Sequence, residues 1–239
     1  MPKQQKKNKA PSFRKEKLMS DNPHTEQSKN MVDLATKRPE FKEIKTPFDT
    51  RAFWDQISSE HMQVAQETFK TQYAAFEEWV DIATEAVKRG NKLIFFGNGG
   101  SAADSQHIVA EMSIKLRKER SPIAALSLSL DASAITACAN DYGFDQIFSR
   151  QIRTLGYGGD VAVGLSTSGN SANIINGLKK AKRMDMITVG LTGETGGKMP
   201  PHCDLMMKVP STDPARIQEM HITFGHMFVG ALEQKLGLV

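Results

Sequence analysis

Short apolar segments alternate with amphipathic segments over the second half of the chain. The candidate strands are Lys92–Phe96, Ile123–Leu128, Asp160–Leu165, Met186–Leu191 and Asp204–Val209. Helical periodicity fills most of the intervals, near residues 101–118, 132–155 and 171–184, whereas residues 193–203 have the composition of a loop. Strands separated by helices are typical of a parallel sheet covered on both faces. We therefore expect an α/β fold with a five-stranded, doubly wound parallel sheet in the order 2-1-3-4-5.

Amphipathic helices are expected on both sides of this alternating region. Apolar residues recur at steps of three and four at Met62, Ala65, Phe69, Tyr73, Phe76, Val80, Ala83 and Val87. This spacing predicts a long helix that ends near Gly90. With Trp54 and Trp79 its apolar surface is wider than one contact needs, so we expect it also to pack against another subunit. A last helix is predicted from Asp213 to about Leu236.

The N-terminal segment, residues 1–48, has little periodicity and is predicted to be a disordered extension that precedes one domain over residues 49–239. Residues 1–20 hold seven Lys or Arg and one Glu, whereas the whole chain has a net charge of only +4. The basic balance therefore belongs to the extension, and the folded part has no sign of a nucleic-acid surface. The extension is either a solvated tail or a contact for an anionic partner.

The composition, with 39% hydrophobic and 24% charged residues, is ordinary for a soluble globular protein. No apolar run approaches the roughly 20 residues of a membrane helix, and the N-terminus has no signal-peptide core. We therefore expect a cytoplasmic protein that has no membrane partner. The two cysteines, Cys138 and Cys203, fit no metal-binding spacing, which favours buried, reduced thiols over a disulfide.

Two loops that are poor in bulky side chains follow the first and third predicted strands. The residues of interest are Asn98, Gly99, Gly100 and Ser101 in the first loop, and Ser166, Thr167, Ser168 and Ser171 in the second. In the expected strand order these strands are neighbours and their following helices lie on opposite faces, so both loops should line one crevice. Hydroxyls and the N–H groups of a helix start suit a compact dianion such as phosphate. Neither loop matches a nucleotide motif, so a small phosphorylated ligand is predicted; the alternative is a serine-rich turn with capping roles.

Two helices carry groups that bind metals or transfer protons. His107 and Glu111 are four residues apart and project from one helical face. On the last helix Gln218 and His226 share a broad face, whereas His221 diverges and is expected to pack or cap. Imidazole, carboxylate and amide oxygen suit Zn²⁺ or another divalent ion. A carboxylate and an imidazole can also transfer protons without a metal, and the residues leave both readings open.

Four motifs resemble those of the sugar isomerase (SIS) domain in sedoheptulose-7-phosphate isomerases, also called phosphoheptose isomerases. They are GNGGSAADSQH, AND at residues 139–141, STSGNSANI and RIQEMH followed by His226. The resemblance covers residues 50–239, and residues 1–45 have no counterpart in it. It implies conversion of D-sedoheptulose 7-phosphate to D-glycero-D-manno-heptose 7-phosphate, a precursor of the heptose in lipopolysaccharide or capsule.

The resemblance also implies a role for each matching residue. The substrate would contact Asn98, Gly99, Gly100, Ser101, Glu111, Asn140, Asp141 and Gln218, and its phosphate would contact Ser166, Thr167, Ser168 and Ser171. One divalent metal ion per subunit, expected to be Zn²⁺, would bind His107, Glu111, Gln218 and His226. Glu111 would act as the base and His226 as the acid. Members of the family are homotetramers with sites at subunit interfaces, which agrees with the wide apolar helix.

A different class of protein shares part of this pattern. The non-catalytic, tetrameric DnaA initiator-associating protein of bacterial replication resembles this chain in the first loop, the serine-rich loop and RIQEMH. Its relatives lack the complete His/Glu pair and the last-helix histidine, whereas Glu111 and His226 are both present in this chain. The isomerase is therefore favoured, and the adaptor is the alternative because the basic extension could touch DNA.

Overall fold

The structure is a computed structural model of the chain, and it describes residues 46–239. Residues 50–239 form one compact unit. The predicted extension, residues 1–48, lies almost entirely outside the described residues, so its disorder and the boundary at residue 49 stay predictions. No helix among the described residues is long and apolar enough to cross a membrane.

A single parallel sheet forms the centre of the compact unit, which confirms the expected fold class. Its strands are β1 (Leu93–Gly97), β2 (Ala125–Ser127), β3 (Val161–Leu165), β4 (Ile187–Gly193) and β5 (Leu205–Val209). The strand order is β2-β1-β3-β4-β5, as predicted, and every neighbouring pair is parallel. Gly97 of β1 lies opposite Leu165 of β3, so these two strands end at the same level and the loops that follow them start side by side.

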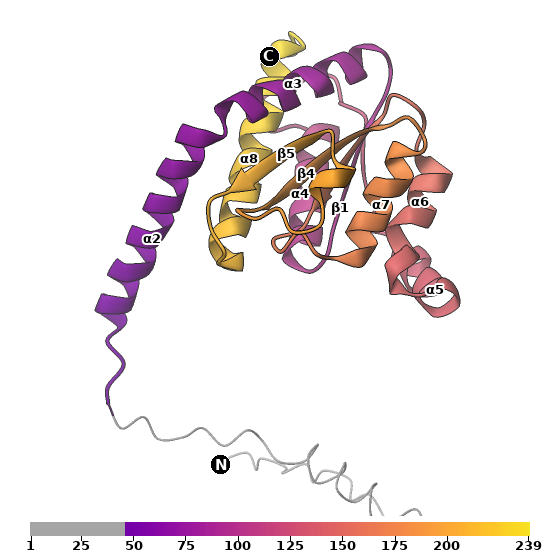
Figure 1. Cartoon of the computed structure of the whole chain (residues 1–239). Coiled ribbons are helices and arrows are strands. Elements are labelled where there is room, and N and C mark those ends of the chain that lie inside the picture. The colour runs from indigo at the N-terminus through magenta and orange to yellow at the C-terminus, as the bar shows by residue number, and fades with distance from the viewer. Residues whose placement is uncertain (1–45) are drawn as a thin grey trace, which may run out of the picture. The chain divides into compact units, whose positions relative to one another are not determined.

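Helices cover both faces of the sheet, and each face has its own apolar core (Figure 1). The helices are α2 (Thr50–Thr71), α3 (Tyr73–Lys88), α4 (Gly100–Ser113), α5 (Ala132–Tyr142), α6 (Ile147–Leu155), α7 (Ala172–Lys182) and α8 (Pro214–Lys235). Leu93 and Phe95 of β1 pack with α3, α4 and α8, whereas Ile94 and Phe96 pack with α6 and α7. Because strand side chains alternate between faces, a strand buried on both sides must be apolar throughout.

Two predicted helical regions are interrupted in the structure. The predicted continuous helix before Gly90 consists of α2 and α3, which are separated at Gln72. The Gln72 side-chain oxygen accepts a hydrogen bond from the Lys208 backbone N–H of the edge strand β5, at 2.9 Å. The helical region predicted near residues 132–155 contains α5 and α6, which are separated at Gly143, whose φ of +90° is incompatible with a helix. The prediction of one long helix before Gly90 is therefore wrong, whereas helices are confirmed near residues 132–155.

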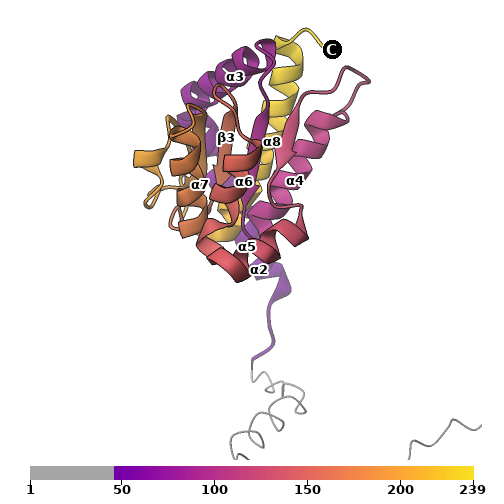
Figure 2. The same ribbon diagram turned by 90° about the vertical axis from the view of Figure 1, so that its right-hand side faces the viewer.

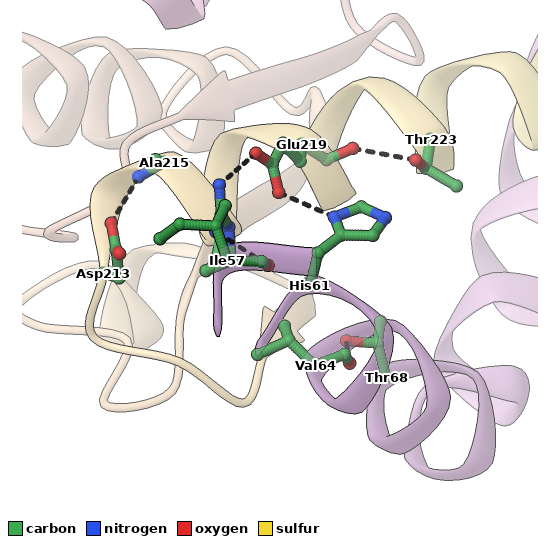
Figure 3. Close-up of polar contacts among 9 residues, drawn as sticks. Ile57, His61, Val64, Thr68, Asp213, Ala215, Glu219 and Thr223 are labelled. Carbon is green, nitrogen blue, oxygen red and sulfur yellow. Dashed lines mark hydrogen bonds and ion pairs between the residues drawn. The ribbon is translucent and has the colours of Figure 1, made fainter. Parts of the chain in front are cut away.

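Helix α2 is attached to α8 by a polar contact (Figure 3). His61 Nδ1 lies 2.7 Å from Glu219 Oε2, and Arg216 donates to the other oxygen of Glu219. Burial alone would raise the pKa of Glu219, but the hydrogen bonds from Arg216 and His61 hold it below its usual value. Several large apolar side chains of the helix pair stay exposed: Phe53, Trp54, Met62, Phe69 and Tyr73. The wide apolar surface expected from the sequence is therefore present, although Trp79 is buried against Phe228.

Both cysteines are free, in agreement with the expectation of reduced thiols. Cys138 is buried, whereas Cys203 is only partly buried, so the expectation of two buried thiols holds for one of them. Burial raises the pKa of the Cys203 thiol to about 12, which keeps it protonated and unreactive near neutral pH.

Candidate active site

The two loops predicted to line one crevice are joined by a reciprocal pair of amide hydrogen bonds. Asn98 Nδ2 donates to Asn173 Oδ1 at 2.9 Å, and Asn173 Nδ2 donates to Asn98 Oδ1 at 2.9 Å. Asn98 follows β1, and Asn173, which is buried, lies in the first turn of α7 after β3. The loop after β1 and the start of the helix after β3, which were predicted to line one crevice, are therefore in direct contact.

Residues 166–171, which we call the serine loop, form a turn whose polar groups are held by one another. Ser166 Oγ accepts from the Gly169 N–H at 3.1 Å and lies 3.2 Å from Ser171 Oγ. Gly169 has a φ of +65°, and a Cβ at this position would lie 2.1 Å from the carbonyl oxygen of Gly196. The turn therefore needs a glycine both for its backbone angle and for its contact with the following loop.

Helix α7 begins at this turn, and of its first three N–H groups only that of Ile174 has a side-chain acceptor among the described residues, Asn173 Oδ1 at 2.9 Å. Ser171 is the N-cap residue, and its side chain makes no capping hydrogen bond within the described residues. The first turn of α7 holds no acidic side chain that could occupy these N–H groups. The charged residues Lys179, Lys180 and Lys182 lie in its last turn. Free N–H groups, the positive end of the helix dipole and adjacent hydroxyls form a suitable site for a phosphate.

A second group of polar side chains lies between α4 and α8, which run side by side (Figure 2). His107 Nε2 is 2.9 Å from His226 Nε2 and 3.5 Å from Glu111 Oε1. One ligand atom from each of the three residues lies within 4.8 Å of the others, a separation compatible with a shared metal ion. Glu111 Oε2 is buried and has no hydrogen-bond partner among the described residues. We call these three residues the His/Glu cluster.

Gln218, the fourth predicted metal ligand, lies against the start of α4. A Cβ at Gly100 would be 2.3 Å from Gln218 Oε1, so the absence of a side chain at Gly100 makes room for the amide. Gln218 therefore joins the first loop to α8, while its role as a metal ligand or substrate contact stays a prediction. His221, one turn further along α8, is fully buried, as the sequence predicted for a packing residue.

Asp104 is a polar residue of this region that the sequence analysis missed. It is buried, and burial raises the pKa of its carboxyl group, while a hydrogen bond from Gln218 and the charge of His107 oppose the shift. Asp104 is the fifth residue of α4, beyond the first turn, which holds no acidic residue. Its spacing from His107 and Glu111 places it on their face of α4 and was the available signal.

Asn140 and Asp141 form a hydrogen bond with each other rather than with either loop. Asn140 Nδ2 donates to Asp141 Oδ1 at 2.8 Å, at the exposed end of α5. No hydrogen bond of the described residues connects this pair to the serine loop or to the His/Glu cluster. Their predicted contact with the sugar therefore stays a prediction.

Comparisons with known proteins agree with this architecture. The SIS domain family model matches residues 58–193. The chain is 45% identical over 176 residues to a phosphoheptose isomerase of Aliarcobacter butzleri (strain RM4018), covering 74% of this chain and 93% of that relative. It is 50% identical over 155 residues to a probable phosphoheptose isomerase of Thermoplasma acidophilum, covering 65% and 85% of the two chains.

A solved structure has the same fold at substantial sequence identity. The phosphoheptose isomerase GmhA from Neisseria gonorrhoeae superposes with a TM-score of 0.74 at 39% identity, covering 78% of this chain and all of that one. The family-model match and the identity over nearly the full length of these relatives agree with each other. The chain therefore belongs to the phosphoheptose isomerase family of SIS-domain proteins.

Proposed function

We propose that this protein converts D-sedoheptulose 7-phosphate to D-glycero-D-manno-heptose 7-phosphate. The observation that carries the proposal is the meeting of Glu111 and His226, from two different helices, in one cluster. The loop at the start of α4 is also hydrogen-bonded, through Asn98 and Asn173, to the helix that follows the serine loop. The names of the relatives support the same activity. They do not favour the alternative of a non-catalytic adaptor, which does not need a complete His/Glu cluster.

Glu111 has the properties required of the base. The reaction removes a proton from C1 of the ketose, passes through an enediolate and returns the proton to C2. Because Glu111 Oε2 is buried and free of partners among residues 46–239, its lone pairs are available for a carbon-bound proton. The same carboxylate can serve both carbons, since they are adjacent.

His226 would transfer protons to and from the sugar oxygens. One proton must leave the hydroxyl on C1 and another must reach the oxygen on C2 as the carbonyl moves between these carbons. Imidazole titrates near neutral pH and can donate and accept these protons in turn. His226 Nε2 lies 2.9 Å from His107 Nε2, so His107 can hold the ring of His226 in a fixed orientation.

The serine loop would hold the phosphate on C7. Hydroxyls of Ser166, Thr167, Ser168 and Ser171, with the first N–H groups of α7, provide neutral donors for a dianion. Binding at the end of the sugar remote from C1 and C2 fixes the orientation of the reacting carbons and lends its binding energy to the chemical step.

The His/Glu cluster fits a divalent metal ion. Two imidazoles and a carboxylate with a partner-free oxygen are a suitable donor set for Zn²⁺, and Gln218 could add an amide oxygen. When bound, such an ion would polarise the carbonyl group and stabilise negative charge on the enediolate. Glu111 and His107 would then hold the ion as well as take part in proton transfer and orientation.

We also propose that the protein is a homotetramer with sites at subunit interfaces. Trp54, Met62 and Tyr73 on the α2–α3 pair are each about two-thirds exposed, which is unusual for large apolar side chains and leaves a surface for a second copy. A neighbouring copy could also bring Asn140 and Asp141 to a site that one chain leaves without them. The cytoplasmic location and the destination of the heptose stay predictions.

The activity is tested by incubating the purified protein with sedoheptulose 7-phosphate and following the aldose product by NMR. Conversion is expected, with a lower rate after chelation and recovery on adding Zn²⁺. A folded protein that gives no aldose product with or without added metal would overturn the proposed function. If a protein shown to be free of metal converts the substrate and chelators do not change its rate, the metal site is refuted and the isomerase activity is retained.

A further inference from the structure

Arg120 lies in the loop after α4 and has its guanidinium group fully buried. Its Nη2 donates to the Glu111 carbonyl oxygen at 2.7 Å, and its Nη1 donates to the Met112 carbonyl oxygen at 2.7 Å. These carbonyls belong to the last turn of α4, where the helix has no further N–H groups to satisfy them. Arg120 therefore caps the helix that carries two members of the His/Glu cluster.

The remaining side of the guanidinium group is attached to α8. Arg120 Nε donates to Glu233 Oε1 at 2.8 Å, and the Leu116 N–H donates to the same oxygen at 3.4 Å. Glu233 is almost fully buried and lies seven residues after His226, which is two turns along the same face of α8. One guanidinium group thus bridges the backbone of Glu111 and the helix that carries His226.

A buried ion pair is a weak source of stability, because desolvation of both charges offsets their attraction. The contacts of Arg120 with the end of α4 and with Glu233 of α8 indicate a role other than stabilisation. We propose that Arg120 and Glu233 are positioning residues that fix α4 against α8 and thereby set the separation between Glu111 and His226. The inference rests on the proposed isomerase function only for its kinetic consequence, since the bridge is a property of the fold.

Two conservative variants separate this role from that of a simple ion pair. Arg120→Lys keeps the charge but cannot donate from three directed N–H groups to Glu233 and to both carbonyls. Glu233→Gln removes the charge but keeps an oxygen that can accept from Arg120 and Leu116. A positioning role therefore predicts that Arg120→Lys is the more damaging variant, whereas a purely electrostatic pair predicts the reverse order.

The expected kinetic result is a fall in kcat of about 10²-fold for Arg120→Lys, with little change in KM, because a displacement near 1 Å is enough for such a loss. Glu233→Gln should keep most of the wild-type kcat. The matched control is Lys92→Gln, at the start of β1, which breaks a 2.6 Å ion pair with buried Asp160. Asp160 keeps hydrogen bonds from the N–H groups of Lys92 and Tyr157, so this variant should fold, melt at a lower temperature and retain kcat.

A structural measurement decides the question without relying on turnover. In a crystal structure of Arg120→Lys, α4 should shift against α8, so the separation between Glu111 and His226 should increase and the distance between His107 Nε2 and His226 Nε2 should increase from 2.9 Å. Neither distance should change in Lys92→Gln. If Arg120→Lys does not fold, Glu233→Ala gives the same test from the side of α8. Unchanged geometry together with unchanged kcat would overturn the inference, and so would a greater loss of kcat in Glu233→Gln than in Arg120→Lys. If the wild-type protein has no isomerase activity, the proposed function is refuted. The positioning role of Arg120 and Glu233 is then tested by the crystallographic distance alone.

Discussion

The serine loop and the His/Glu cluster satisfy their polar atoms in opposite ways. In and around the serine loop the side chains pair with one another: Ser166 with Ser171 and the Gly169 N–H, and Asn173 with Asn98. In the His/Glu cluster Glu111 Oε2 is buried without a partner among the described residues, and the side chain of His107 is half exposed. The serine hydroxyls of the loop thus have partners within the protein, whereas the cluster has a buried oxygen with bonding capacity left for a ligand.

This difference indicates where the chain sacrifices stability for chemistry. An unsatisfied buried oxygen costs about 1–3 kcal/mol, and natural proteins keep such groups mainly at functional sites. The neutral donors of the serine loop carry no such cost, because they can exchange their internal bonds for bonds to phosphate. We therefore expect substitutions in the cluster to lower kcat and substitutions in the loop to raise KM.

Glu111→Gln tests the cluster side and should have the largest effect. The amide keeps the shape of the side chain but cannot accept the carbon-bound proton, so kcat should fall at least about 10³-fold, within the range that general bases contribute. Binding of the sugar phosphate, measured by isothermal titration calorimetry, should stay close to that of the wild type. A variant that turns over at a near wild-type rate would show that Glu111 is not the base.

Gly169→Ala tests the loop side. The new Cβ would lie 2.1 Å from the Gly196 carbonyl oxygen on a residue whose φ is +65°, so the turn must change its shape. We expect KM to rise roughly 10- to 100-fold, the equivalent of one lost charge-assisted hydrogen bond, with a much smaller change in kcat. Steady-state kinetics with the sugar phosphate measures both constants.

The matched control for this variant is Gly230→Ala in α8. A Cβ at Gly230 would meet Leu116 at 3.5 Å, an ordinary contact, and alanine suits a helix interior better than glycine. Both kinetic constants should therefore be unchanged. If Gly169→Ala lowered kcat and left KM unchanged, the assignment of binding to the loop and chemistry to the cluster would be wrong.

His221→Gln tests how a buried residue of α8, the helix that carries His226, affects stability at low pH. Burial lowers the pKa of His221 to about 4, and an interaction with the Thr192 backbone opposes this shift only in part. Neither ring nitrogen forms a hydrogen bond of regular geometry in the described part of the chain. Because the folded pKa lies below the unfolded value near 6.5, protonation favours unfolding. The wild-type protein should lose roughly 3 kcal/mol of stability between pH 7.5 and pH 4 from this residue.

Urea denaturation at several pH values measures this loss. In His221→Gln the free energy of unfolding should fall less steeply with decreasing pH below pH 6.5. The kcat at pH 7.5 should stay near that of the wild type, because His221 is buried in the core. A slope equal to that of the wild type would assign the acid sensitivity to other groups.

Local periodicity was sufficient to predict much of this molecule. The five apolar runs gave the strands, and their spacing gave the parallel order, because continuous burial and helical crossovers leave few alternatives. The spacing of His107 and Glu111 placed them on one helical face, and the family motifs connected them with His226. The bounds were less accurate: β2 has only three residues and α4 ends at Ser113.

Contacts between distant residues were beyond the reach of such patterns. At the break between α2 and α3, Gln72 accepts a hydrogen bond from Lys208 of β5, which lies 136 residues further along the chain. The bridge from Arg120 to Glu233 spans 113 residues, and in the sequence Arg120 is one cation among several in a basic loop. The position of Gln218 against Gly100 likewise becomes visible only when α4 and α8 are packed together.

Removal of residues 1–45 should have the smallest effect, because it leaves both halves of the site intact. Every residue assigned to the serine loop, the first loop and the His/Glu cluster lies at or after Asn98. We expect residues 46–239 to retain the kcat and KM of the full chain in the same assay. A rise in KM alone would show that the basic segment assists phosphate binding through its charge, since long-range attraction raises the local concentration of an anion and should weaken with added salt. A fall in kcat alone would instead connect the segment to the His/Glu cluster, and the cluster could then no longer be regarded as complete without it.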